Sequence, residues 1–280
     1  MNSVISQPNR TEVERILVFI PAYNCNKQIT RVLDQFKGVE SYFTEILVVD
    51  NQSPDNTLEA VCQSAKLSKL PMTIIRNDGN YGLGGSHKVA FGYATENNFD
   101  YCIVLHGDDQ GNIHDLIPQL EAGAHRSVDC LLGARFAPNA KLEGYSLFRR
   151  FGNQVFNVLF SIVAGKRLYD LGSGLNLYRV SSIAREQYNG FANNLTFNYF
   201  MILASVHWGW NICFFPITWR EDDQISNVKL ARQSMQVLSI LARYIFQRST
   251  LLSQNFSGRN SDDYKYTVIA RHNPCSSLQD

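Results

Sequence analysis

Within the five consecutive residues 106–110, four side chains are suited to a divalent cation: one imidazole, two carboxylates and one amide, from His106, Asp108, Asp109 and Gln110. They follow the apolar run 102–105, which is typical of a buried strand. Open α/β sheets place their ligands at the carboxyl ends of such strands. Mg²⁺ takes one or two carboxylates together with substrate phosphates. The run therefore predicts a metal site, and an Asp-rich turn that merely ends the strand is the alternative.

A second candidate is the glycine-rich loop 77–85, which contains Asn80, Gly82 and Gly84 and precedes a predicted helix at 86–95. Backbone amides of such a loop and helix start make an anion site. The loop lacks the third glycine of a dinucleotide fingerprint and the Gly-Lys-Ser/Thr ending of a P-loop. Because two other polar strand ends are expected beside it, we favour a role around a nucleotide over a plain tight turn.

The elements that must position these residues alternate regularly along the chain. Apolar runs predict buried strands at 16–20, 45–49, 72–75 and 102–105, and helical periodicity separates them at 29–36, 58–65 and 86–95. Such alternation means right-handed βαβ units. The predicted fold class is α/β, with a mostly parallel sheet flanked by helices.

Composition excludes several classes of protein. The 280 residues are 45% hydrophobic and 18% charged, as in ordinary globular proteins, and a net charge of +1 argues against a nucleic-acid binder. Six cysteines without a Cys-x-x-Cys pair indicate small buried side chains in a reducing compartment. Residues 1–15 are polar and lack the apolar stretch of a signal peptide. The uncharged stretch 197–219 favours a helix at 195–206 and a strand at 211–217 over a membrane span, because polar residues, Gly and Pro interrupt it.

Six motifs, taken in order, resemble family 2 of the glycosyltransferases, which has the GT-A fold, and most closely its polyprenyl- and dolichyl-phosphate sugar synthase branch. The motifs are Pro21-Ala22-Tyr23-Asn24, Val48-Val49-Asp50-Asn51 with Ser53-Pro54-Asp55, Asn80-Tyr81-Gly82-Leu83-Gly84, His106-Gly107-Asp108-Asp109-Gln110, Gly133-Ala134-Arg135-Phe136 and Asp170-Leu171-Gly172-Ser173-Gly174. The resemblance covers about residues 14–230.

This resemblance implies a site for a nucleoside-diphosphate sugar. In the family, residues after the first strand line the base and ribose pocket, and the acid after the second strand holds the base or ribose. Carried over to this chain, the nucleotide-sugar site consists of Pro21, Ala22, Tyr23, Asn24, Asp50, Asn51, Ser53, Asn80, Gly82, Gly84, Lys88, Gly107, Asp108 and Asp109.

The resemblance also implies Mg²⁺ or Mn²⁺ as cofactor. Asp108 takes the metal position of the family's Asp-x-Asp motif, with Gln110 beside it. The sequence departs from the family at His106, which replaces the first Asp of that motif, and at Cys25, which replaces a usual Glu. His106 stays a candidate ligand for metal or ribose.

The predicted acceptor follows from a missing carboxylate. Family members that glycosylate hydroxyl groups carry a catalytic Asp at a later helix start, whereas the corresponding segment 192–199 has none. A phosphate acceptor is its own nucleophile, because its second pKa is about 6. Segment 135–185, with eight basic and two acidic residues, also suits a phosphate, although a basic face on an anionic membrane is the alternative for most of these cations.

Catalytic and acceptor residues are assigned on the same resemblance. The catalytic candidates are Asp108, Asp170 and Arg135. The acceptor and phosphate contacts are Arg135, Arg149, Ser173, Arg220, Ser226 and Lys229, with Arg150 as an alternative to Arg149.

The chain divides into an N-terminal arm (1–13), a GT-A domain (14–230), an amphipathic helix (231–252) and an irregular polar tail (253–280). The helix has an apolar stripe that suits either a bilayer interface or packing on the domain. Because a lipid acceptor is expected, we favour the interface. The predicted location is cytoplasmic, peripheral on the cytosolic face of a membrane.

Together, these features predict an inverting, metal-dependent enzyme that moves a sugar from a nucleoside-diphosphate sugar to a polyprenyl (dolichyl or undecaprenyl) phosphate. One alternative is transfer to a sugar hydroxyl of a lipid-linked glycan in O-antigen or capsule-type polysaccharide synthesis, with Asp170, Asp222 or Asp223 as base. Another is a catalytically inactive sugar-nucleotide-binding module. No nucleic-acid partner is expected, and a homo-oligomer is left open.

Overall fold

A mixed eight-stranded sheet forms the centre of the computed structural model, which describes residues 13–184, 187–221 and 230–274. Its strand order is β10-β3-β2-β1-β4-β7-β5-β8. The bounds are β1 Ile16–Ala22, β2 Glu45–Asp50, β3 Met72–Asn77, β4 Tyr101–Leu105, β5 Cys130–Ala134, β7 Leu175–Arg179, β8 Ile212–Pro216 and β10 Tyr266–His272. Strands β7 and β10 pair antiparallel with their neighbours, and the other pairs are parallel. The predicted α/β class with a mostly parallel sheet is confirmed.

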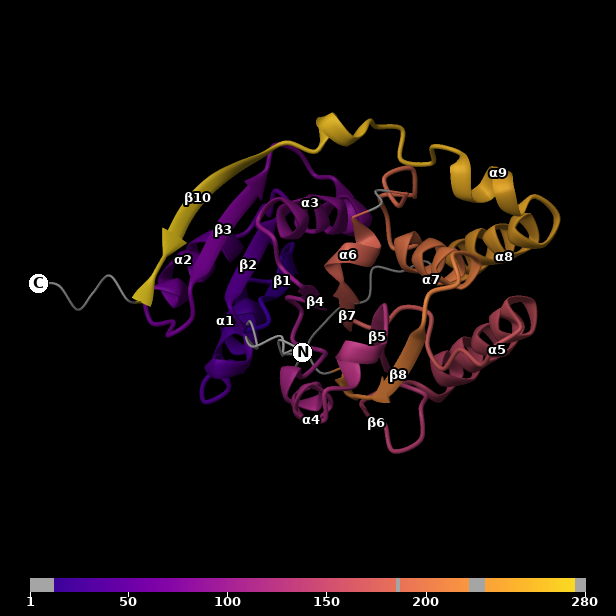
Figure 1. The fold of residues 1–280 in the computed structure, drawn as a ribbon, viewed down its shortest axis with the longest axis horizontal. Helices are drawn as coiled ribbons and strands as arrows, with labels where there is room; N and C mark the ends of the chain where they lie inside the picture. The colour runs from indigo at the N-terminus through magenta and orange to yellow at the C-terminus, as the bar shows by residue number, and fades with distance from the viewer. Residues whose placement is uncertain (1–12, 185–186, 222–229, 275–280) are drawn as a thin grey trace, which may run out of the picture.

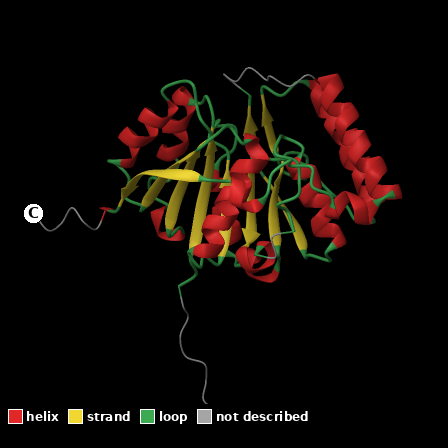
Figure 2. Cartoon of the chain, turned by 90° about the horizontal axis from the view of Figure 1, so that it is seen from above, coloured by secondary structure: helices red, strands yellow, loops and turns green. Residues whose placement is uncertain are grey.

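Helices cover both faces of this sheet (Figures 1 and 2). The α-helices are α1 Asn26–Asp34, α2 Thr57–Ala65, α3 Gly82–Glu96, α4 Ile117–Glu121, α5 Leu147–Ala164, α6 Val180–Ile183, α7 Phe197–His207, α8 Leu230–Phe246 and α9 Arg248–Ser253. Successive side chains of a strand point to opposite faces. Leu17 and Phe19 of β1 therefore join the core under α3 and α7, whereas Val18 and Ile20 join the core under α1 and α2.

Strand β1 fixes where the polar strand ends meet. It pairs in parallel with β2, opposing Ala22 to Asp50, and in parallel with β4, opposing Phe19 to Val104. Parallel strands end at the same edge of a sheet, so the residues after β1, β2 and β4 converge there. The polar motifs predicted to form a site are brought together by this register.

The C-terminal residues correct one prediction. Residues 253–280 were expected to form an irregular tail, but Tyr266–His272 is strand β10, paired antiparallel with β3 at the edge of the main sheet. Most of β10 stays exposed, and its hydrogen-bond ladder with β3 joins it to the sheet. An edge strand of this kind leaves little of the apolar alternation by which strands are predicted.

Helices α5 and α8 lie side by side at the end of the molecule opposite β10 (Figure 1). Near them, β6 (Lys141–Glu143) and β9 (Thr218–Arg220) pair as a short parallel ribbon. The uncharged stretch at 197–219 forms α7, β8 and part of β9, as a helix and a strand were predicted there. None of the described helices has both the length and the apolar character needed to cross a bilayer.

Candidate active site

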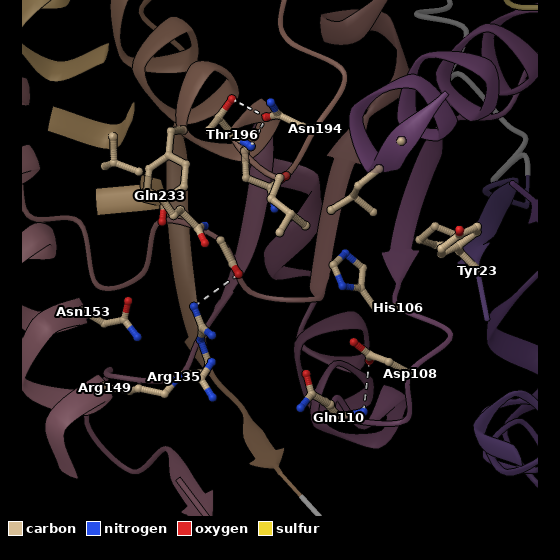
Figure 3. Close-up of a pocket in the computed structure, with 18 of the residues that line it drawn as sticks. Tyr23, His106, Asp108, Gln110, Arg135, Arg149, Asn153, Asn194, Thr196 and Gln233 are labelled. Atoms are coloured by element: carbon tan, nitrogen blue, oxygen red, sulfur yellow. Dashed lines mark hydrogen bonds between the residues drawn. The ribbon is translucent and has the colours of Figure 1, made fainter. Parts of the chain in front are cut away.

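A cavity of about 920 Å³ opens at the edge where β1, β2 and β4 end. Figure 3 shows Tyr23, His106, Asp108 and Gln110 on one side of it. Arg135, Arg149 and Asn153 lie on the facing side, and the loop that carries Asn194 and Thr196 closes a third side. The cavity therefore collects residues from all six motifs found in the sequence, together with a loop and a helix that those motifs do not include.

Eight of the predicted nucleotide-sugar residues line this cavity. They are Pro21, Ala22, Tyr23, Asn51, Asn80, Gly82, Gly107 and Asp108. Asn51 joins the strand ends, since its Oδ1 accepts hydrogen bonds from Asn77 Nδ2 at 3.0 Å and from the backbone N of Tyr81 at 2.8 Å, and its Nδ2 donates to Asn80 Oδ1 at 2.9 Å. This network fixes the polar wall of the cavity.

Six other predicted nucleotide-sugar residues do not line the cavity, and all of them except the exposed Asn24 are buried. They are Asn24, Asp50, Ser53, Gly84, Lys88 and Asp109. The fully buried Asp50 accepts a hydrogen bond from the backbone N of Ser53 at 3.1 Å, and Arg76 Nε lies 3.1 Å from its other oxygen. A Cβ on Gly84 would lie 2.5 Å from the carbonyl oxygen of Ala192, so this glycine permits close backbone packing. These residues shape the site from outside the cavity.

The two neighbouring carboxylates of the HGDDQ run are used differently. Asp108 lines the cavity, where withdrawal from water raises its pKa to about 6, and the backbone N of Gln110 donates to it at 3.2 Å. Asp109 has a left-handed backbone with φ of 60° and turns away to accept hydrogen bonds from Arg31 Nε at 2.6 Å and Gln35 Nε2 at 3.0 Å. Asp108 thus faces the cavity, whereas Asp109 holds the turn.

His106 is neutral and faces the cavity. Burial, and secondarily the positive charge of Arg135, lower its pKa to about 4. Its Nε2 is buried and has no hydrogen-bond partner among the described residues. A neutral imidazole with an unpaired ring nitrogen can contact a metal ion or a ligand hydroxyl.

The donor set fits a divalent ion only in part. Within the described ranges, no group of three or more His, Cys, Asp or Glu side chains is placed to hold a metal. Asp108 supplies one carboxylate, and Gln110 and His106 border the same space. Because Mg²⁺ is commonly held by one or two carboxylates together with substrate phosphates, this set suits an ion that the diphosphate of a bound nucleotide would help to hold.

A buried ion pair dominates the opposite side. Arg135 donates from Nε and Nη2 to the two carboxylate oxygens of Asp170 at 2.8 and 2.7 Å, and its backbone N donates at 2.9 Å. Although burial opposes it, the Asp170 carboxylate raises the pKa of Arg135. Arg135 lines the cavity and Asp170 does not, so Asp170 positions the guanidinium.

The other predicted acceptor residues also differ in whether they line the cavity. Arg149 lines the cavity, and its Nη1 lies 2.6 Å from Glu221 Oε2. Ser173 lies away from the cavity, where its hydroxyl hydrogen-bonds Leu175 O and Asn176 Oδ1. Arg220 faces Asp109 at 3.6 Å. Ser226 and Lys229 lie outside the described residues, as do Asp222 and Asp223.

Several cavity residues were not predicted. Asn153 of α5 lies one helical turn after Arg149 and donates to Tyr145 Oη at 2.6 Å. Asn198 lines the cavity with a buried Oδ1 that has no partner among the described residues. For Asn153, the i, i+4 spacing from Arg149 indicates that both side chains lie on one face of α5. Nothing in the sequence marks that face as the one that lines the cavity.

Comparisons with known proteins agree with this architecture. Residues 17–186 match the model of the family Glycosyl transferase family 2. The undecaprenyl-phosphate mannosyltransferase of Micrococcus luteus is 25% identical over 170 residues, which are 60% of this chain and 68% of that protein. The polyprenol monophosphomannose synthase of Mycolicibacterium smegmatis is 20% identical over 209 residues, 74% of this chain and 78% of that one. The glucosyl-3-phosphoglycerate synthase of M. tuberculosis superposes with a TM-score of 0.57 at 14% identity, covering 95% of this chain and 93% of its own, and shares the fold.

The chain belongs to glycosyl transferase family 2 and is a glycosyltransferase. Its relatives include enzymes named for polyprenyl phosphates, so the predicted resemblance to that branch is confirmed.

Removing Asp170 should destabilise the fold. Asp170→Ala leaves the buried Arg135 charge without its partner, and we expect the free energy of unfolding to fall by about 3–5 kcal/mol. Urea unfolding followed by far-UV circular dichroism measures the change. Glu221→Ala, which breaks the more exposed Arg149 pair, is the control and should cost about 1 kcal/mol or less. Equal losses in the two variants would contradict the assignment of Asp170 as the main support of Arg135.

Proposed function

We propose that this enzyme moves a sugar from a nucleoside-diphosphate sugar to a polyprenyl phosphate, with inversion at the anomeric carbon and with the help of Mg²⁺ or Mn²⁺. The observation that supports it best is the set of carboxylates at the cavity. Among its described lining residues, the only carboxylates are Asp108 and Glu221. Asp108 is assigned to the metal, and Glu221 is paired with Arg149.

A hydroxyl acceptor needs a base to take its proton, whereas an ionised phosphate attacks without one. In the proposed step an oxygen of the acceptor phosphate bonds to the anomeric carbon, and the bond from that carbon to the nucleoside diphosphate breaks. A divalent ion held by Asp108, Gln110 and His106 would supply charge neutralisation for the leaving diphosphate. Asp170 is engaged by Arg135 and lies outside the cavity, which argues against it as a base for the hydroxyl-acceptor alternative.

Two arginines are available for the acceptor phosphate. Arg135 is held by Asp170 and by stacking, with its guanidinium carbon 5.0 Å from the Trp219 ring centroid. Arg149 comes from α5, and its guanidinium carbon lies 5.1 Å from the Tyr145 ring centroid. Planar guanidinium groups bind phosphate oxygens in pairs, and rigid placement lowers the entropy lost on binding.

The surface beside the cavity supports a membrane as partner. Helix α5 exposes a row of apolar side chains: Leu147, Phe148, Phe151, Val155, Val158, Leu159 and Ile162. The neighbouring α8 adds Met235, Leu238, Ile245 and Phe246. Neither helix contains Asp or Glu, whereas both contain Arg. An apolar face with basic residues around it suits the surface of an anionic bilayer.

The sequence favours this role for the helix at 231–252, with a basic membrane-facing surface within 135–185 only as an alternative. Much of the apolar stripe of α8 packs instead on the domain, since Val237, Leu241 and Tyr244 are buried in the core. Helix α5 carries the larger exposed row, and its Phe148 both is exposed and lines the cavity. We therefore assign the main membrane contact to α5, with the cavity mouth beside the lipid from which an acceptor would come.

Transfer itself tests the proposed reaction. The full chain is incubated with a panel of UDP- and GDP-sugars, Mg²⁺ or Mn²⁺ and a short-chain polyprenyl phosphate. A labelled lipid product that disappears with EDTA is expected. Donor hydrolysis without lipid labelling, or labelling of a sugar hydroxyl acceptor in its place, would refute the phosphate acceptor.

The two neighbouring aspartates give a matched test of the metal site. Asp108→Asn should lower turnover at saturating Mg²⁺ by about 100-fold or more, because a charged ligand is lost. Asp109→Asn alters a carboxylate outside the cavity and should keep metal-dependent turnover within about tenfold of the wild type. Initial rates across a metal titration measure both. Equal losses would show that Asp108 has no special role.

Flotation with vesicles tests α5 directly. In the double variant Phe151→Ser/Ile162→Ser, two exposed apolar side chains that lie outside the cavity lining are replaced. We expect the fraction of protein bound to phosphatidylglycerol-containing vesicles to fall at least tenfold, because each lost side chain removes apolar area from the bilayer. Leu67→Ser, at an equally exposed apolar residue after α2, is the control and should bind as the wild type does. Unchanged flotation of the double variant would exclude α5 as the contact.

A further inference from the structure

The segment between α9 and β10, residues 254–265, passes over α3 from the α8 end of the molecule to the opposite sheet edge (Figure 1). We call this segment the strap. It contacts the loop 190–194, which leads directly into the cavity-lining residues Asn194, Leu195 and Thr196. The backbone N of Phe256 donates to Gly190 O at 2.7 Å, and Asn193 Nδ2 donates to Ser257 O at 3.1 Å.

A buried lysine completes the junction. Lys88 of α3 donates from Nζ to Phe191 O at 2.5 Å, Asn193 Oδ1 at 2.8 Å and Tyr264 Oη at 3.0 Å. Tyr264 Oη in turn donates to Asn193 Oδ1 at 2.7 Å. An ammonium group has three N–H donors, and here each has an acceptor. Lys88, Asn193 and Tyr264 therefore form a closed cluster that ties helix, loop and strap together.

The cluster lies directly behind the cavity wall. Asn193 O accepts a hydrogen bond from the backbone N of Gly84 at 2.8 Å, and a Cβ on Gly82 would lie 2.4 Å from that same carbonyl oxygen. Gly82 lines the cavity on one side of this contact, and Asn194 lines it on the other. A shift of the loop would thus move two parts of the wall at once.

We propose that the strap is a positioning element of the active site, in which Tyr264 and Lys88 hold the loop 190–196 against the start of α3. Tyr264 and Lys88 do not line the cavity, so they act through the loop rather than on a substrate. Burial lowers the pKa of Lys88 to about 7, in keeping with an amine that is removed from water. The role is separate from the identity of the acceptor.

Tyr264→Phe tests the proposal while keeping the aromatic packing. The Tyr264 ring makes an edge contact with the Tyr81 ring, with 5.5 Å between the centroids, and Lys88 Nζ lies 5.0 Å from the Tyr264 centroid. A phenylalanine ring can keep both contacts. The lost hydroxyl removes two hydrogen bonds of the cluster. The matched control is Tyr266→Phe, two residues further on, whose hydroxyl makes no hydrogen bond within the part of the chain that the structure describes.

Two readouts separate positioning from general stability. Hydrogen exchange of the amides in 190–197 should become about tenfold faster in Tyr264→Phe, with the strands of the central sheet unchanged. KM with the donor chosen from the UDP- and GDP-sugar panel should rise about tenfold while kcat stays within about twofold, because Asp108 and Arg135 are not altered. The exchange readout needs no substrate, so it stands whether or not the lipid acceptor is correct.

The outcomes that overturn the proposal are explicit. If Tyr264→Phe matches Tyr266→Phe in exchange and in KM, the strap is a structural brace without influence on the site. If Tyr264→Phe lowers Tm by more than about 5 °C, Asn193→Ser is measured instead. It removes Asn193 Oδ1, the loop's acceptor for Lys88 and Tyr264, and leaves the Lys88–Tyr264 bond in place. Unchanged exchange and KM in that variant would equally reject the proposal.

Discussion

The parallel pairing of β1 with β2 and β4 is the constraint on which the site depends. It aligns Ala22 with Asp50 and Phe19 with Val104, so the chain leaves all three strands at one edge. Backbone groups beyond the strand ends no longer pair with a neighbouring strand, so they need other hydrogen-bond partners. The Asn51–Asn77–Asn80 network supplies them and leaves Tyr23, His106 and Asp108 facing the cavity.

Charge in the cavity follows from which groups are already paired. Arg135 is neutralised by Asp170 and Arg149 by Glu221, while no cationic side chain of the described residues forms an ion pair with Asp108, whose pKa is raised to about 6 by withdrawal from water. A carboxylate in that condition gains most from a divalent ion. The pairs on the opposite wall hold the two guanidinium groups in place without closing the space between the walls.

Parts of the chain far from the motifs also border the cavity or contact its wall. The exposed row on α5 lies next to the cavity mouth, and the strap links the α8 end of the molecule to the loop behind the cavity. Lys88 lies in a different environment from the one that the family resemblance implies. The family resemblance made it a nucleotide contact, whereas the structure buries its Nζ among acceptors from the loop and the strap.

The sequence alone determined the α/β class, the four strands β1 to β4 and the family, because buried strands and their polar ends are local patterns. It placed both Asp108 and Asp109 in the nucleotide-sugar site, whereas the left-handed backbone at Asp109 turns that carboxylate away from the cavity. Nor did it find β10, the inner face of α5 or the cluster around Lys88. Each of these depends on contacts between residues distant in the chain, such as Lys88 with Tyr264, and no local pattern encodes such a contact.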